Sequence, residues 1–309
     1  MTSPFGPMRL IANPTAGRGR EAVLPRLRSA LDARGLEHDV AWTRRAGEAT
    51  ELARIAVSDD QLRYVVAVGG DGTIHEVVNG LVDPGSGQPV AQGLVLGAVP
   101  AGTGCDFVRT FGMDRRPEQL ARHLDGDTLF PIDLGRIRLV GADGQPLTRL
   151  FANIAECGYG GVVTARANAM PKQLGKVRYL LAIFRALREF TRVQTEVVVD
   201  HARLDEIITN VVIANGQFFG GNMKVAPRAI PDDGRFNVQV WRGKPSDVFL
   251  KTNKIRLGEH LPDPDIREYQ SASVYVEGRE PLLIEADGEV LGVTPATFDV
   301  LPKVLSLKV

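Results

Sequence analysis

The stretch VAVGGDGTIHEVVNG (66–80) begins as an apolar strand and breaks into a loop in which three glycines surround one aspartate. A helix is predicted to follow at once, because apolar residues recur at helical spacing after the loop. Thr73 and Glu76 fit a capping box, which predicts that their side chains close the N-terminus of this helix. A turn needs only one glycine. Three glycines let backbone N–H groups approach a bulky anion at a helix N-terminus, so the loop is typical of a phosphate site.

Residues 8 to 135 alternate strand patterns with helical patterns. Strands are predicted at 8–13, 38–43, 64–68 and 93–100, and helices at 21–35 and 47–57. This alternation favours a parallel sheet with helices on both faces. Ligands bind such sheets at the carboxyl ends of the strands, which is where the glycine loop lies.

The pattern changes after about residue 135. Eight β-rich runs separated by turn residues follow, and only KQLGKVRYLLAIFRALREF (172–190) reads as a helix. The second half is therefore expected to be an antiparallel β domain that carries one amphipathic helix. We predict two domains, 1–135 and 136–309.

The composition is that of a globular protein with balanced charge. The 309 residues include 37 Lys plus Arg and 37 Asp plus Glu, which gives no support to a nucleic-acid partner. Cys105 and Cys157 match no disulfide or metal spacing, which favours a reducing compartment. The N-terminus has no signal-peptide pattern, and the apolar runs are shorter than the ~20 residues of a membrane span. We therefore expect a soluble, cytoplasmic protein.

Two further glycine-bearing loops follow predicted strands, NPTAGRG (13–19) and PAGTGCDF (100–107). Three such loops at one edge of a parallel sheet could line a single nucleotide site. An alternative is a Rossmann dinucleotide site, because GRGREA (17–22) matches its G-x-G-x-x-A fingerprint. That fold places an acidic residue at the end of the second strand, and here the strand ends in Thr43. No loop carries the G-x-x-x-x-G-K-[ST] sequence of a P-loop NTPase.

In this order the three loops resemble those of the diacylglycerol kinase catalytic domain in its soluble bacterial lipid-kinase form. The resemblance continues in ANGQFFGGNMKVAPRAIPDDGRFNV (214–238), which is similar to the family's N-G, G-G, A-P-x-A and D-G stretch. It also covers IEADGE (284–289), which is similar to the family's catalytic D-G-E. The GGDGT element alone is shared with NAD kinases, and the two later segments favour a lipid kinase.

The resemblance implies an α/β plus β fold, with an N-terminal three-layer α/β domain like that of NAD kinase and a C-terminal antiparallel β-sandwich-like domain. The last residues, about 300–309, are expected to return to the first domain. The family implies ATP and Mg²⁺ as cofactors, a lipid substrate presented by a membrane surface, and frequent homodimers. The residues implied to bind the nucleotide are Asn13, Thr43, Gly69, Gly70, Asp71, Gly72, Thr73, Ile74, His75, Thr103 and Asp106.

Phosphoryl transfer to a hydroxyl is assisted by a carboxylate that takes the proton of the attacking group. From spacing alone, EADGEVLG (285–292) is a β-hairpin turn with solvated acids. The resemblance instead makes Glu289 the general base and Asp287 a partner for that base or for Mg²⁺. Asp71 is expected to hydrogen-bond backbone or to face Mg²⁺, since a carboxylate beside a phosphate is otherwise repulsive. We therefore expect Glu289, Asp287 and Asp71 to be catalytic.

The segment IPDDGRF (230–236) offers a second metal site. The resemblance implies a structural Mg²⁺ held by Asp233 and by the main-chain carbonyls of Ile230 and Arg235. The alternative is a plain type I turn.

The chain departs from the family pattern at two positions. Cys105 stands in the third loop where the family often has Asn, which puts in doubt the hydrogen bond that the family's side chain makes there. His75 stands where Asn is common, directly after the glycine turn. Neither change removes Asp106 or the glycines.

The helix at 172–190 carries an apolar stripe that includes Val177, Leu180, Leu181 and Phe184, with basic residues elsewhere. Such a helix can cover a core. It can also touch the membrane from which a kinase collects an insoluble substrate.

The leading hypothesis is an ATP- and Mg²⁺-dependent kinase that phosphorylates a hydroxyl of diacylglycerol or a related lipid, with transient peripheral membrane contact. The alternatives are a sphingoid-base kinase, an NAD kinase-type enzyme, and a nucleotide- or lipid-binding protein without transfer activity. An ATP assay against lipids and NAD distinguishes these hypotheses.

Overall fold

The computed structural model describes residues 3–14, 20–102, 104–113, 116–141, 143–171, 174 and 176–309. The chain divides into two compact units. Unit 1 comprises Met1–Leu134 and Leu301–Val309, and unit 2 comprises Gly135–Val300. Each unit has its own hydrophobic core. Within the described ranges, no helix is both long enough and apolar enough to span a membrane.

Unit 1 is built on a parallel sheet with the strand order β2-β1-β3-β4. Its strands are β1 (Met8–Ala12), β2 (His38–Trp42), β3 (Tyr64–Gly69) and β4 (Val95–Pro100). Every residue of β3 and β4 is buried, as expected for inner strands that are covered on both faces.

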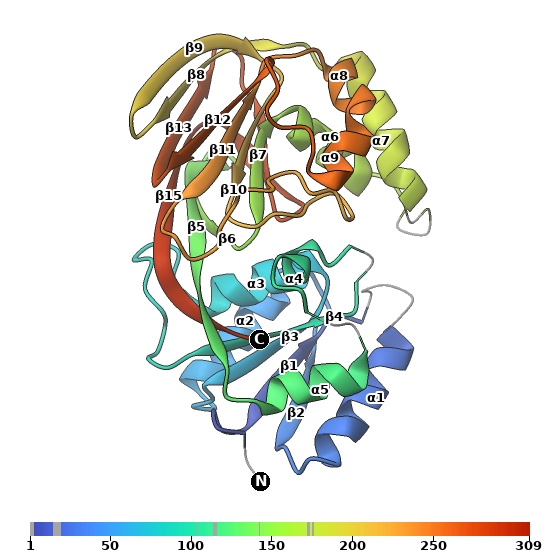
Figure 1. Ribbon diagram of the computed structural model, residues 1–309. Helices are drawn as coiled ribbons and strands as arrows, with labels where there is room; N and C mark the ends of the chain where they lie inside the picture. The colour runs from blue at the N-terminus through green and yellow to red at the C-terminus, as the bar shows by residue number, and fades with distance from the viewer. Residues whose placement is uncertain are drawn as a thin grey trace. The chain divides into compact units, whose positions relative to one another are not determined.

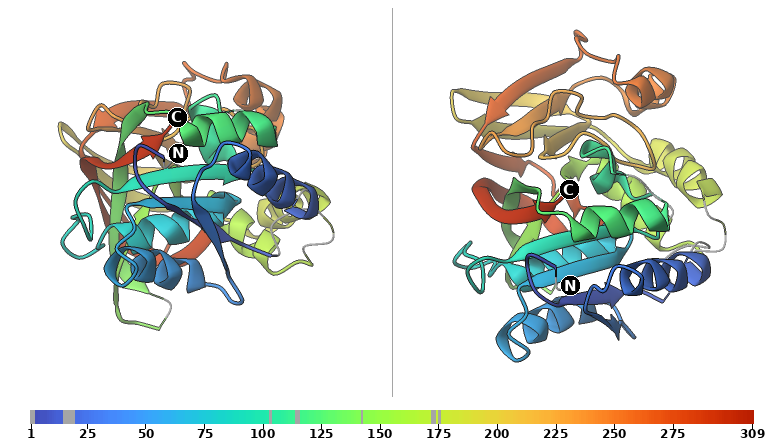
Figure 2. Two further views of the ribbon diagram at one scale, coloured as in Figure 1. Left: turned by 90° about the horizontal axis from the view of Figure 1, so that it is seen from below. Right: turned by 60° about the horizontal axis from the view of Figure 1, so that its bottom comes forward.

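Helices cover both faces of the unit 1 sheet (Figures 1 and 2). One pair, α1 (Arg20–Asp32) and α5 (Pro117–Asp125), packs together on one face, and α2 (Glu48–Ser58) and α3 (Asp71–Leu81) pack together on the other. The short α4 (Asp106–Thr110) follows β4. Alternate strand residues form the core beneath α1 and α5, so the apolar periodicity of strands and helices determines the three layers.

The end of the chain joins the sheet of unit 1 (Figure 1). Strand β15 (Glu289–Lys308) begins in unit 2 and pairs in parallel with β4 near its end. Lys308 is buried there, and its ammonium group donates to the carbonyl of Thr128 at 3.0 Å. Burial lowers the pKa of Lys308.

Unit 2 is an antiparallel β structure. One run of strands has the order β12-β11-β10-β7-β14-β15; a second run, β9-β8-β13, also joins β15, as does β5 with its partner β6. The bounds are β5 (Leu129–Gly141), β6 (Pro146–Phe151), β7 (Ile154–Gly158), β8 (Val193–Val199), β9 (Ala202–Ile208), β10 (Asn210–Ala214), β11 (Phe236–Trp241), β12 (Ile266–Ser271), β13 (Ser273–Gly278) and β14 (Leu283–Ala286).

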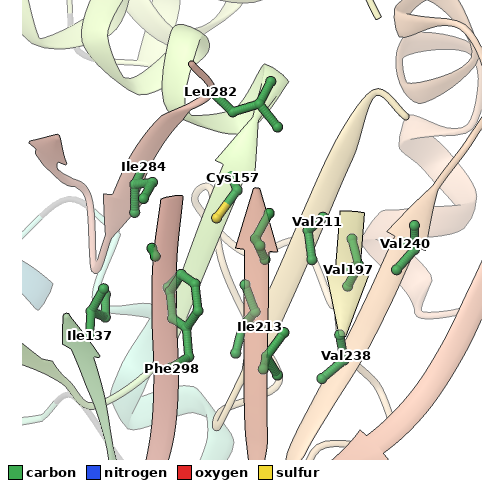
Figure 3. Close-up of a cluster of buried hydrophobic side chains, with 14 of the residues drawn as sticks. Ile137, Cys157, Val197, Val211, Ile213, Val238, Val240, Leu282, Ile284 and Phe298 are labelled. Carbon is green, nitrogen blue, oxygen red and sulfur yellow. The ribbon is translucent and has the colours of Figure 1, made fainter. Parts of the chain in front are cut away.

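Side chains from these strands converge on one apolar core (Figure 3). Ile213 and Val238 come from the first run, Val197 comes from the second, and Phe298 belongs to β15, which both runs share. This is sandwich-like packing, in which alternate residues of each strand point inward. The predicted α/β plus β fold class is therefore confirmed.

Unit 2 has more helices than the sequence predicts. The expected helix at 172–190 is α7 (Lys176–Glu189), but α6 (Tyr159–Asn168), α8 (Pro245–Leu250) and α9 (Thr252–Leu257) are also present. The prediction of a single helix was wrong. α6 begins with Tyr-Gly-Gly, which reads as a loop, and α8 and α9 have only six residues each, too few to show a helical period.

Candidate nucleotide and catalytic sites

Three loops of unit 1 begin at the carboxyl edge of its sheet. The amide of Asn13 donates to the last valine of β3 at 3.2 Å, and the amide of Thr43 donates to the end of β1 at 3.0 Å. The amide of Ala101 donates to the carbonyl of Gly69 at 2.9 Å. These bonds extend the strand pairing just past β1, β2 and β4, so the loops after β1, β3 and β4 start side by side. This is the edge where open α/β sheets bind ligands.

Two of the loop glycines are required by close contacts, Gly102 where the third loop touches the second and Gly69 where the second loop packs against its own helix. A Cβ atom on Gly102 would lie 2.6 Å from the Cα of Gly70, and one on Gly69 would lie 2.2 Å from the hydroxyl of Thr73. Neither distance is tolerated by real atoms. Close packing of loops is therefore a second reason for the glycines, beside the approach of an anion.

Asp71 joins the second loop to the third. Its carboxylate accepts the amides of Asp106 at 3.1 Å and Phe107 at 2.9 Å, at the start of α4. Asp106 is buried, with its carboxylate 3.5 Å from the guanidinium of Arg109. A Cβ atom on Gly104 would lie 3.4 Å from the carboxylate of Asp71 and 3.7 Å from that of Asp106. Two carboxylates therefore gather around one glycine.

The predicted capping box at the start of α3 is wrong. The N-cap is Gly70, and no side chain caps this helix end. Because α3 already begins at Asp71, Glu76 lies within the helix and faces α2. Its carboxylate accepts the amide of Ala49 at 3.0 Å, in the first turn of α2. The N-terminus of α3 is left without a side-chain cap, which suits an anion.

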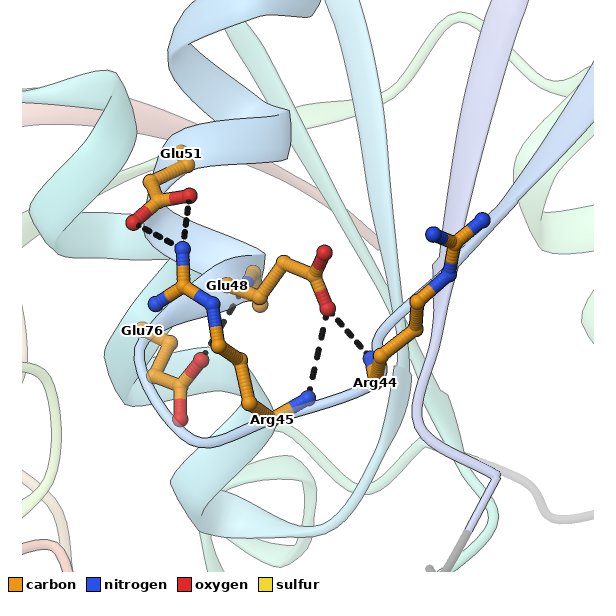
Figure 4. Close-up of polar contacts among 6 residues, drawn as sticks. Arg44, Arg45, Glu48, Glu51 and Glu76 are labelled. Carbon is orange, nitrogen blue, oxygen red and sulfur yellow. Dashed lines mark hydrogen bonds and ion pairs between the residues drawn. The ribbon is translucent and has the colours of Figure 1, made fainter.

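The loop after β2 is anchored by acids of α2 (Figure 4). Glu48 accepts the amides of Arg44 and Arg45, the latter at 3.2 Å, and the guanidinium of Arg45 pairs with Glu51 at 2.6 Å. The backbone hydrogen bond from Arg44 is the main cause that lowers the pKa of Glu48. These contacts fix the backbone directly after Thr43.

Three of the other predicted nucleotide residues have buried side chains. Ile74 and His75 are buried in α3, as is Thr73, so their side chains pack within unit 1. The amides of Thr73 and Ile74 bond the carbonyl of Gly70 at 3.0 and 3.2 Å. Thr103 lies outside the described residues.

The D-G-E turn of unit 2 connects β14 to β15. Asp287 and Gly288 have φ angles of +50° and +89°, the left-handed pair of a type I′ hairpin. The buried carboxylate of Asp287 accepts three amides, those of residues 152, 153 and 154, at 2.9, 3.0 and 3.2 Å. Glu289 is exposed. The alternative from spacing alone, two solvated acids, is therefore wrong for Asp287, which anchors the turn to the start of β7 and the loop before it.

Sequence reasoning missed a pair of buried acids beside this turn. Glu285 on β14 lies opposite Glu156 on β7. Burial, with Glu156 as neighbour, raises the pKa of Glu285 well above its ordinary value, and burial raises the pKa of Glu156 to about 7. One signal was available: in LLIEAD (282–287) an acid interrupts an otherwise apolar strand.

The segment at 230–236 forms a turn. The carboxylate of Asp233 accepts the amide of Arg235 at 2.9 Å, and the side chains of Ile230 and Asp233 are exposed. In the described part of the chain, no group of three or more His, Cys, Asp or Glu side chains is placed to hold a metal ion. The turn accounts for this sequence by itself, and a structural Mg²⁺ there stays a prediction.

The chain thus combines glycine-rich loops on the parallel sheet of unit 1 with a β-sandwich-like unit 2 that carries a D-G-E turn. Residues 7–137 match the diacylglycerol kinase catalytic domain, and residues 153–309 match the YegS C-terminal NAD kinase beta sandwich-like domain. The chain belongs to the diacylglycerol kinase family of lipid kinases.

Relatives from bacteria match the chain over most of its length. The diacylglycerol kinase of Bacillus subtilis (strain 168) is 30% identical over 299 residues, which cover 94% of this chain and 92% of the relative. The diacylglycerol kinase of Staphylococcus carnosus (strain TM300) is 28% identical, over 94% of this chain and 90% of the relative. A crystal structure of a diacylglycerol kinase from Bacillus anthracis str. Sterne has the same fold, with a TM-score of 0.69 at 20% identity over 99% of this chain and 97% of that one.

The contact between Glu76 and α2 gives a first testable prediction. Glu76→Ala removes the acceptor for the Ala49 amide, and we expect the free energy of unfolding to fall by about 1–2 kcal/mol, as for loss of a helix cap. Glu51→Ala is the matched control, because it breaks only the exposed ion pair with Arg45, and exposed pairs contribute little to stability. Urea unfolding measures both variants. Equal stability of the two would contradict this role of Glu76.

Proposed function

We propose that the chain transfers the γ-phosphate of ATP, in the presence of Mg²⁺, to a hydroxyl of diacylglycerol or a closely related lipid. The observation that carries the proposal is the loop assembly of unit 1, where the loops after β1, β3 and β4 start side by side and the N-terminus of α3 has no side-chain cap. The names of the bacterial relatives support diacylglycerol as the acceptor.

The loop assembly fits the phosphates of a nucleotide. Gly70 and Gly102 pack without side chains at the end of β3, so the backbone is accessible to a bulky anion. The dipole of α3 favours negative charge at this end. We assign nucleotide contacts to Asn13, Thr43, the span 69–75 and Asp106. Within the span, the buried side chains pack inside unit 1, and the backbone is the part assigned to the nucleotide.

Mg²⁺ fits this site as part of a complex with ATP. Mg²⁺ commonly binds through one or two carboxylates together with substrate phosphates. The carboxylates of Asp71 and Asp106, which flank Gly104, are the residues that would serve. When bound, the metal would neutralise charge on the phosphates. Asp71 also keeps the third loop in place through the amides of Asp106 and Phe107.

Glu289 is assigned as the general base. Its carboxylate is exposed, as a group that meets a substrate hydroxyl must be, and it follows directly on an anchored turn. Asp287 fixes that turn through three backbone amides, which keeps the start of β15 in one position. A carboxylate that takes a proton in the transition state typically contributes 10²–10⁴-fold to the rate.

Unit 2 presents an apolar surface that suits a lipid membrane. Of the fifteen large hydrophobic side chains that are exposed among the described residues, eight lie on or beside α7, α8 and α9. They are Leu174, Val177, Leu180, Leu181, Phe184, Phe249, Leu250 and Leu257. We call these eight residues the apolar surface. The rings of Phe184 and Phe249 lie 5.3 Å apart, which connects α7 to α8.

The way α7 packs explains why these apolar side chains stay exposed. Ala182 and Ala186 are fully buried against α6, and Ile183 and Leu187 pack beside them. The helix therefore has one face that covers a small core and a second apolar face that is exposed. Arg185, Arg188, Lys254 and Arg256 lie on the same helices, and cations beside an apolar face favour anionic lipid.

Gly102→Ala tests the nucleotide site. The added Cβ would meet the Gly70 backbone at 2.6 Å, so we expect MgATP binding to weaken about tenfold or more as the loops separate. Gly85→Ala is the control, because its Cβ would meet only the carboxylate of Asp83 at 3.4 Å. Calorimetric titration with MgATP measures both. Wild-type affinity in Gly102→Ala would argue against the loops as the nucleotide site.

Glu289→Gln tests the chemistry. We expect kcat to fall about 10²–10⁴-fold while the melting temperature and the affinity for MgATP stay unchanged. Radiolabelled ATP is offered with diacylglycerol, a sphingoid base and NAD as separate acceptors, and Glu280→Gln serves as an exposed control. Transfer to NAD without lipid would favour the NAD kinase-type alternative. ATP binding without transfer to any acceptor would favour a binding protein.

Leu181→Ser combined with Leu250→Ser tests the apolar surface. Both side chains are exposed, so folding should be unaffected, and we expect co-sedimentation with phosphatidylglycerol-containing vesicles to fall several-fold. Ile207→Ser, an exposed position on β9, is the matched control. If the double variant binds the vesicles as strongly as the wild type, the apolar surface is not the membrane-binding site.

A further inference from the structure

A buried carboxyl pair lies next to the 287–289 turn. Glu285 and Glu156 are directly opposed on antiparallel strands, where Cβ atoms are ~5 Å apart. Ile284 and Ala286 point into the sandwich core, so strand alternation directs Glu285 to the other face of the sheet. α6 packs on that face, over both β7 and β14. Glu285 is fully buried, and Glu156 is 7% exposed.

The surroundings of the pair are acidic, so the pair keeps a proton. The other charged groups that act on Glu285 are Asp287 and Glu289, both of which also raise its pKa. Burial, and after it the charge of Glu156, raises the pKa values of Cys157 on β7 and Tyr159 on α6. Two adjacent buried carboxylates cannot both be charged without a cation. Glu285 is therefore the uncharged acid of the pair at neutral pH.

Hydrogen bonds connect the pair to the turn on one side and to α6 on the other. One oxygen of Glu285, Oε2, accepts the amide of Gly288 at 3.0 Å. Oε1 of Glu156 accepts the side-chain amide of Asn210 at 2.8 Å, and Asn210 in turn accepts the amide of Gly160 at 3.1 Å. The carbonyl of Gly288 accepts the side chain of Asn168, near the end of α6, at 3.1 Å.

The fold makes room for these carboxyl groups specifically. A Cβ atom on Gly160 would lie 2.0 Å from Oε2 of Glu156, so a side chain there would displace the carboxyl group. Oε1 of Glu285 is buried without a hydrogen-bond partner in the described part of the chain. A proton retained between the two glutamates would satisfy that oxygen.

We propose that the Glu156–Glu285 pair positions the catalytic turn, with Glu285 fixing the Gly288 amide and Glu156 fixing Glu285. This inference rests on the proposed function, in which Glu289 takes the proton of the acceptor hydroxyl. Gly288 precedes Glu289 in the chain, so the orientation of its peptide unit sets the direction in which the Glu289 side chain leaves the turn. Both buried glutamates are positioning residues, since they act through Glu289.

The test compares Glu285→Gln with Glu285→Met. Gln keeps an acceptor for Gly288 and can donate to Glu156, whereas Met has similar length but neither group. We expect Glu285→Met to lower kcat about tenfold or more with an unchanged KM for ATP, and Glu285→Gln to keep kcat within about twofold. Glu277→Gln, an exposed glutamate on β13, is the control.

Hydrogen exchange provides a readout that does not need activity. Amides of the peptide 283–290 are expected to exchange faster in Glu285→Met than in the wild type, and at the wild-type rate in Glu285→Gln. If the wild type transfers phosphate to no acceptor, the proposed function fails, and this readout still decides whether the pair fixes the turn. Wild-type kcat and wild-type exchange in Glu285→Met would overturn the inference. So would equal loss of kcat in the Gln and Met variants.

A second variant covers the case in which Glu285→Met does not fold. Glu156→Gln with Glu285→Gln preserves both side-chain shapes and removes the retained proton. Folding raises the pKa values of both glutamates, so their stabilisation is complete below the unfolded pKa of about 4.5 and is lost as pH rises through about 7. The melting temperature of the wild type should therefore fall relative to that of the double variant between pH 5 and pH 8. If the melting temperatures of the wild type and the double variant change with pH in parallel, the inference that the pair keeps a proton is wrong.

Discussion

The structure depends on aspartate carboxylates that bind the backbone amides of a distant loop. Asp71 accepts the amides of Asp106 and Phe107, and Asp287 accepts those of residues 152–154. Each aspartate precedes a glycine, Asp71 at the start of α3 and Asp287 in the hairpin turn, and each bond spans a large sequence separation. Hydrogen bonds from amides to a charged acceptor are stronger than neutral ones. Both candidate site loops are thus fixed by the same device, one in each unit.

Glycine is the second constraint, and it acts together with the first. Asp71 can bind the third loop only because that loop comes close enough, and the contact between Gly102 and Gly70 shows how little space separates the two. In unit 2, Gly160 gives the carboxyl group of Glu156 its room beneath α6 in the same way. The glycines that suggest a phosphate site therefore also permit close packing, and the two roles are compatible because both need exposed backbone.

The sequence predicts the layers better than it predicts the polar contacts. Apolar periodicity located β3 and α3, and the order of loops with the D-G-E segment indicated the family. The sequence did not predict the hydrogen-bond partner of Glu76. A capping box is a local pattern, whereas the actual partner, Ala49, belongs to another helix. The sequence also did not predict α6, because Tyr-Gly-Gly resembles a loop until the sheet beneath it is known. Long-range partners are set by tertiary packing, which spacing does not encode.

The acids of one short segment of unit 2 differ in burial, in charge and in hydrogen-bond partners. In EADGE (285–289), Glu285 is buried and uncharged, Asp287 is buried and bound to three amides, and Glu289 is exposed. Strand pairing places Glu285 opposite Glu156 on β7, and the hairpin turn places Asp287 against the amides of residues 152–154. Only the third acid faces solvent, where it can meet a substrate. A reaction that needs one base among several carboxylates is served when burial removes the others from competition.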